Sequence, residues 1–172
     1  MIINASPLII LAKINKLEIL KKNYESVEIA RSVYQEVVVN GLKINSRDAH
    51  IVKEQIESKN IKVLDLSSEF IKKAKKIESI YGIGIGEAET IALALQLDKK
   101  EAIIDEIPAR EAAKAFGIKP IGTLRVLLIA YKDGLIGKAE IKELINEMEN
   151  SKYRFSPKVL IEFWDLLGKI KK

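Results

Sequence analysis

Residues 87–105, EAETIALALQLDKKEAIID, decide the fold. Residues 87–97 are nearly all apolar over a helical length, which predicts a helix buried on most sides. Residues 101–105 are a short apolar run that predicts a buried strand. In an αβ unit the helix runs antiparallel to the strand that follows it, and both segments here span about 16 Å. Glu87 and Asp105 are therefore predicted to lie at one edge of a sheet.

The rest of the chain alternates short apolar runs with longer amphipathic segments, which is typical of an α/β protein. About four short parallel strands with helices on both faces are expected, within a single domain over residues 1–172. Strands are predicted at 1–4, 27–30, 61–66 and 101–105, with 118–121 as a short strand or extended connection. Helices are predicted from Ser6 and Pro7 onward and at 17–22, 32–40, 45–58, 67–80, 87–97, 107–116, 122–136, 138–149 and 157–168, with a loop at 81–86.

The composition argues against several kinds of metal site and catalytic nucleophile. Cysteine is absent and His50 is the single histidine, which argues against thiolate zinc sites, cysteine nucleophiles and multi-histidine metal sites. The net charge of +5, from 29 Lys plus Arg against 24 Asp plus Glu, is compatible with nucleic-acid binding. No apolar run approaches the ~18 residues of a membrane span, and no basic leader precedes the first strand, so a cytoplasmic protein without a membrane segment is expected.

Carboxylates are predicted to converge at one edge of the sheet. Parallel strands joined by right-handed crossovers place all their carboxyl ends together, and ligands bind outside that edge. Oxygen donors without histidine or cysteine suit Mg²⁺ or Mn²⁺, an ion that activates water and stabilises charge on a phosphodiester. The residues expected at this edge are Asn4, Glu36, Glu87 and Asp105, with Glu89 and Glu106 as close alternates.

Simpler interpretations stand beside this one. Glu87 could be an acid favoured by a helix N-terminus, and Asp105 could be an N-cap. Caps alone, however, do not require a common edge. Thr123 is interpreted as a helix cap, and Arg110 as the partner of a carboxylate or of a substrate phosphate. A solvated face or a phosphate-contacting patch is predicted for Lys72, Lys73, Lys75 and Lys76, which Lys99, Lys100, Lys169, Lys171 and Lys172 could extend.

Several motifs together carry a family resemblance. IINASPLIILAKI at 2–14 resembles the first strand and helix of PIN-domain nucleases, and VYQEVV at 33–38 resembles the segment with their second acid. Four further segments resemble a prokaryotic PIN-like subgroup related to VapC toxins: GIGEAETIALALQL at 84–97, IIDEIPAREAAKAFGI at 103–118, GTLRVLLIAYKDGLI at 122–136 and RFSPKVLIEFW at 154–164.

The resemblance implies a three-layer α/β/α fold with a central parallel sheet of about four to five strands. It also implies a toxin-like, Mg²⁺- or Mn²⁺-dependent endoribonuclease that acts on RNA, forms a homodimer and pairs with an antitoxin protein. Its acidic positions fall on Asn4, Glu36, Glu87 and Asp105, with Glu106 as the alternate for the last and Ser6 as the accompanying hydroxyl.

Asn4 departs from the family pattern, which has aspartate there. The amide keeps an oxygen donor but loses a charge, so weaker metal binding is expected. The metal ligands would then be Glu36, Glu87 and Asp105, and Thr123 would border the mouth of the site. A second hypothesis follows from the same residue: a PIN-like protein that binds RNA or regulates a partner with weak or no catalysis.

Overall fold

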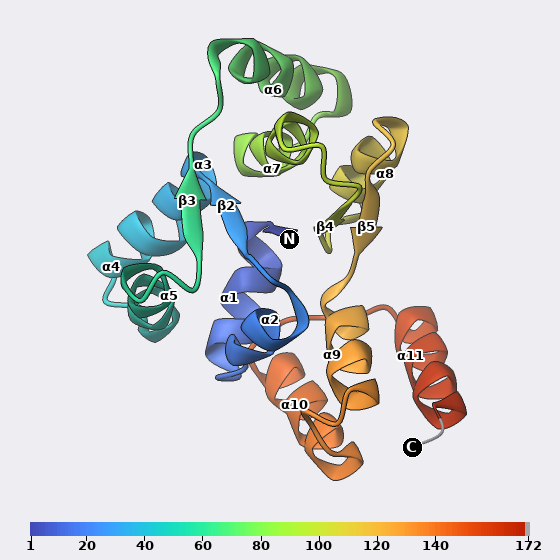
Figure 1. The fold of residues 1–172 in the computed structure, drawn as a ribbon. Coiled ribbons are helices and arrows are strands. Elements are labelled where there is room, and N and C mark those ends of the chain that lie inside the picture. The colour runs from blue at the N-terminus through green and yellow to red at the C-terminus, as the bar shows by residue number, and fades with distance from the viewer. Residues whose placement is uncertain (171–172) are drawn as a thin grey trace.

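A computed structural model describes residues 1–170, and its centre is a five-stranded sheet in the order β3-β2-β1-β4-β5 (Figure 1). All neighbouring strands are parallel, with Ile3 beside Ile103 and Ile103 beside Ile121. This confirms the predicted α/β fold. The strands are β1 (Ile2–Ile3), β2 (Glu28–Ala30), β3 (Lys62–Leu64), β4 (Glu101–Ile103) and β5 (Lys119–Ile121).

Helices cover both faces of the sheet. Because parallel crossovers are right-handed, the connections from β1 to β2 and from β2 to β3 lie on one face, and the connections to β4 and β5 lie on the other. Figure 1 shows α6, α7 and α8 grouped apart from α1, α2 and α9. The helices are α1 (Ala5–Lys13), α2 (Glu18–Asn23), α3 (Arg31–Tyr34), α4 (Gly41–Lys43), α5 (Arg47–Glu57), α6 (Ser68–Tyr81), α7 (Ile85–Gln96), α8 (Ile107–Ala115), α9 (Thr123–Lys132), α10 (Lys138–Asn150) and α11 (Pro157–Lys169).

Most of the helix α7 is buried. It packs against β1, β2 and β4 and against α3, α6 and α8. Ile91 and Leu93 are fully buried, and the alanines between and beside them let the neighbouring elements approach closely. The prediction of a helix buried on most sides is confirmed. Across residues 1–170, no helix is both long enough and apolar enough to cross a membrane.

Among the helix starts that differ from the sequence prediction, three lie next to the predicted site residues. The N-cap of α1 is Asn4 rather than Ser6, and that of α9 is Gly122 rather than Thr123. The hydroxyls of Ser6 and Thr123 instead bond to acids from other elements. The expected loop ends two residues early, because Gly84 caps α7 and Ile85 begins it. In each case a residue with extended backbone sits one or two positions earlier than the pattern indicated.

The predicted helix at 32–40 changes its winding along its length. It starts as α3 and continues as a π-helical segment, Gln35–Asn40, before the short α4. This wider segment contains three consecutive valines, whose branched side chains crowd the turns of an α-helix. Glu36 lies in its first turn. Short π-helical segments often occur at functional sites, and this one carries the predicted site residue Glu36.

The burial of α7 gives the first prediction. Ile91→Ala should lower the free energy of unfolding by about 2–5 kcal/mol, because the substitution leaves a cavity in a packed core. Ile80→Ala on α6 is the matched control, since Ile80 is 71% exposed and Ile91 is 0% exposed. Urea unfolding followed by circular dichroism measures both. An equal decrease in the free energy of unfolding of the two variants would contradict the central place of α7 in the core.

Candidate active site

The centre of the site lies where β1 and β4 end. The backbone N–H of Asn4 donates to the Ile103 carbonyl at 3.0 Å, which extends the pairing of these strands by one residue. The Asn4 amide then reaches Glu106, with Nδ2 3.5 Å from Oε2, and the Ser6 hydroxyl donates to the other Glu106 oxygen. Thr90 on α7 donates to the Asn4 Oδ1 at 3.3 Å. Asn4, Ser6 and Glu106 therefore form one connected group.

Two further acids approach this group from the π-helical segment and from α7. Glu87 accepts the Gly84 N–H at 2.8 Å and so caps its own helix, as the simpler interpretation anticipated. The carboxylate of Glu36 lies over the start of α7: a Cβ placed on Gly86 would stand 3.2 Å from Glu36 Oε2. Glycine at this buried position thus allows the carboxylate to come close to the helix backbone.

These acids repel one another. Burial raises the pKa of Glu36, and the charges of Glu106 and Glu87 raise it further. Burial also raises the pKa of Glu87, and Glu106 adds to this, while the Gly84 hydrogen bond opposes it. Within residues 1–170, none of these three carboxylates has a lysine or arginine nitrogen within 4.0 Å. Among the described side chains, the cluster is thus not paired with a lysine or arginine.

Asp105 precedes Glu106 but makes a different set of contacts. Its Oδ1 accepts the Thr123 N–H at 2.8 Å, and its Oδ2 accepts both the Thr123 hydroxyl, at 2.5 Å, and the Tyr153 hydroxyl. Burial raises the pKa of Asp105 despite these donors, and burial beside Asp105 raises the pKa of Tyr153. Asp105 thus ties β4 to α9 and to the connection between α10 and α11. Sequence analysis missed Tyr153, which is 48 residues away from its partner and belongs to no recognised motif.

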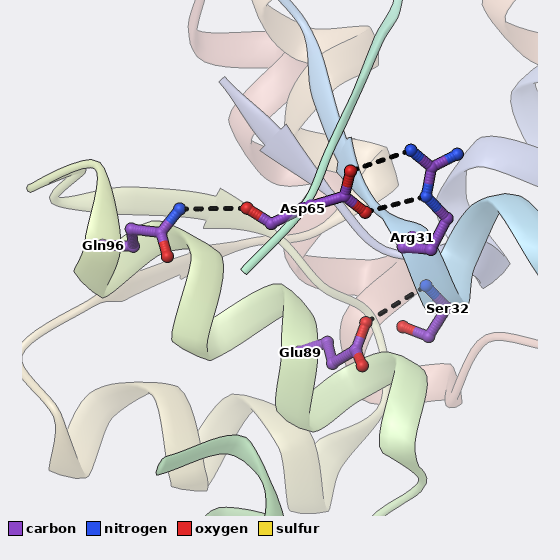
Figure 2. Close-up of polar contacts among 5 residues, drawn as sticks. All are labelled: Arg31, Ser32, Asp65, Glu89 and Gln96. Carbon is purple, nitrogen blue, oxygen red and sulfur yellow. Dashed lines mark hydrogen bonds and ion pairs between the residues drawn. The ribbon is translucent and has the colours of Figure 1, made fainter. Parts of the chain in front are cut away.

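Glu89 is turned away from the cluster. Figure 2 shows its carboxylate directed at the start of α3, where it accepts the Ser32 N–H at 3.1 Å. The N-cap of α3 is Ala30, which has no side-chain acceptor, so Glu89 supplies the cap from another helix. Nearby, Arg31 pairs with Asp65 through two bonds of 2.9 and 3.0 Å. These contacts hold the segment that leads to Glu36.

The basic residues predicted near the site are placed as follows. Arg110 donates to the Ile104 carbonyl at 2.8 Å rather than pairing with a carboxylate within residues 1–170, and its contact with a substrate phosphate stays a prediction. Lys73 lies over the Phe70 ring, and Lys100 pairs with Asp98. Exposed positions on α6 belong to Lys72, Lys75 and Lys76, whereas Lys171 and Lys172 are outside the described residues.

The donor set fits a hard divalent ion in its chemistry. Carboxylate, amide and hydroxyl oxygens are what Mg²⁺ and Mn²⁺ prefer, and uncompensated acids favour a bound cation. In the arrangement of residues 1–170, however, no group of three or more histidine, aspartate or glutamate side chains is placed so that it could hold a metal ion. An ion held by three of these carboxylates at once would need them to draw together, whereas one or two carboxylates with bound waters can also hold Mg²⁺.

Comparison with known proteins agrees with the fold. The family model described as PIN domain matches residues 1–169, nearly the whole chain. No curated protein and no solved structure matches the chain. PIN domains are typically nucleases and generally use divalent metals. With a five-stranded, all-parallel sheet flanked by helices and a family match of this length, the chain belongs to the PIN-domain family.

Proposed function

We propose that this protein is a metal-dependent endoribonuclease of the PIN type that hydrolyses RNA phosphodiesters. The observation that carries the proposal is the proximity of the carboxylates of Glu36, Glu87 and Glu106, of which Glu106 contacts Asn4 at the carboxyl edge of the sheet. Within residues 1–170, none of the three is paired with a lysine or arginine. Such a group is costly to a fold unless an ion offsets it, and a nuclease needs that ion.

Glu36, Glu87 and Glu106 are the residues that would hold Mg²⁺ or Mn²⁺. When bound, the ion would lower the pKa of a water and offset charge on the phosphodiester. Of the two acids that follow β4, Glu106 is favoured as the ligand because its carboxylate contacts Asn4 and Ser6. Asp105, a ligand in the family-based prediction, already accepts three hydrogen bonds from Thr123 and Tyr153, and its Oδ1 has room for one further partner.

The neutral groups of the site would position these acids. Asn4 is fixed by the backbone bond to Ile103 and by the Thr90 hydroxyl, so its amide is presented to Glu106 in one orientation. Ser6 holds the second oxygen of Glu106. Asn4 and Ser6 together hold the Glu106 carboxylate in place against the repulsion of Glu36 and Glu87. The Asn4 amide and the Ser6 hydroxyl can each also donate a hydrogen bond to a nearby water or accept one from it.

A second candidate function rests on Asn4 itself: a PIN-like protein that binds RNA or regulates a partner with weak or no cleavage. The amide brings no negative charge where the family pattern has an acid, which weakens attraction for a cation. The single-domain organisation over residues 1–172, the toxin-like role, the antitoxin partner, the homodimer and the cytoplasmic location stay predictions from the sequence.

Loss of one ligand should remove cleavage. Glu87→Gln should lower the rate of Mn²⁺-dependent cleavage of single-stranded RNA by about 100-fold or more, since a charge that stabilises the reacting centre is lost. Glu89→Gln is the matched control on the same helix: glutamine keeps an oxygen to accept the Ser32 N–H, so activity should change little. Cleavage by all three proteins at equal rates would indicate a contaminating nuclease or a different site.

The charge at position 4 separates the two candidate functions. Asn4→Asp should tighten Mn²⁺ binding, measured by calorimetry, and should raise the cleavage rate, because it adds a carboxylate beside Glu106. Asn4→Ala controls for loss of the amide contacts. If the unaltered protein shows no cleavage and Asn4→Asp creates it, the native chain belongs to the second candidate function.

The raised pKa values predict a pH effect on stability. A carboxyl whose pKa is higher in the folded state adds stability at low pH and loses it as pH rises through that pKa. Glu36→Gln in EDTA should therefore raise Tm relative to the unaltered protein more at pH 7 than at pH 4.5. Mn²⁺ at pH 7 should raise Tm of the unaltered protein more than that of the variant. A variant less stable at pH 7 would contradict the proposed repulsion.

A further inference from the structure

A groove of about 850 Å³ opens between α9 and α11, a volume within the range of ligand-binding sites. It begins at Asp105 and Glu106, passes β5, and continues between the two helices beside the connection at 152–156. Its floor is apolar, with Leu128 from α9 and Phe163 from α11 among the lining side chains. One end of the α9–α11 groove is therefore the candidate active site itself.

Arginine is concentrated along this groove. The chain has five arginines, and three of them line the groove: Arg110, Arg125 and Arg154. Within residues 1–170, none of these three has a carboxylate oxygen within 4.0 Å, whereas Arg31 is paired with Asp65. Arg125 and Arg154 are also exposed, so their guanidinium groups are open to an anionic ligand. Guanidinium groups bind phosphate with two bonds and stack on planar rings.

Aromatic rings also line the groove. Tyr153 and Phe155 both line the groove, with ring centroids 5.4 Å apart in an edge-to-face arrangement. Both are half-buried, so part of each side chain is accessible. Tyr153 is held in place by its hydroxyl bond to Asp105. Aromatic side chains in a positively charged groove are the usual platform for the bases of a single strand.

We propose that the α9–α11 groove binds single-stranded RNA and leads the strand to the acidic site. The phosphates would lie against Arg125, Arg154 and Lys152, and a base would stack on Phe155. This inference rests on the proposed function for the identity of the substrate and adds the path of the strand. The unpaired cations favour RNA over an apolar protein helix, which would need no arginine at the rim.

The test is RNA binding in EDTA, where no cleavage occurs. A fluorescein-labelled oligoribonucleotide of mixed sequence is titrated with the full chain, and fluorescence anisotropy gives Kd at several salt concentrations. The groove variant is Arg125→Gln with Arg154→Gln. The matched control is Lys75→Gln with Lys76→Gln, which removes the same charge from α6, far from α11 in Figure 1. Phe155→Ala tests stacking separately.

The groove variant should weaken binding about tenfold or more. It should also reduce the slope of log K against log salt concentration by about 1.4 in magnitude, since two phosphate contacts on a single strand are lost. Phe155→Ala should weaken binding about tenfold, and the α6 variant should change it less than twofold. Equal losses in the groove and α6 variants, or no loss in the groove variant, would overturn the proposal even if the protein cleaves RNA. Groove-dependent binding without cleavage in Mn²⁺ would uphold the groove and overturn the nuclease function.

Discussion

The packing of α7 against the middle of the sheet is the constraint on which the site depends. Three residues in the first turns of α7 each contribute to a different part of the site. Glu87 is one of the acids, Thr90 bonds the Asn4 amide, and Glu89 caps α3. Because the rest of the helix is buried between β1, β2, β4 and neighbouring helices, it cannot rotate or slide without opening the core. The relative positions of Asn4, Glu36 and Glu87 therefore follow from core packing.

The core also has to tolerate an electrostatic cost. Glu36 and Glu87 are partly desolvated and lie near the charge of Glu106, so their charged forms are disfavoured. Hydrogen bonds from Gly84, Asn4 and Ser6 offset part of this cost but supply no positive charge. A site built this way is less stable when empty than when it holds a cation. That difference in free energy is available for binding the ion, since a ligand that binds only the folded state stabilises it.

The sequence predicted the fold and the edge of the sheet where the acids meet, because helix and strand lengths and chain direction are local properties. The direction in which each side chain points is not local. Asp105 and Glu106 are adjacent, yet one bonds Thr123 and Tyr153 while the other bonds Asn4 and Ser6. Glu89 likewise looked equivalent to Glu87, but its partner is the N–H of Ser32, 57 residues away. Such choices depend on which distant donor tertiary packing brings near.

The split between Asp105 and Glu106 links the acidic site to the C-terminal helices. Asp105 holds Tyr153, and Tyr153 belongs to the short connection that also supplies Phe155 and Arg154 to the groove. A shift of that connection would pull on Asp105, and through the next peptide bond it would move Glu106 against Asn4. The groove is thus connected to the acidic site through Asp105 and the adjacent Glu106. If RNA binds the groove as proposed, its contact with this connection would act on Asp105 and on the adjacent Glu106, so binding of the strand and alignment of the site would be coupled.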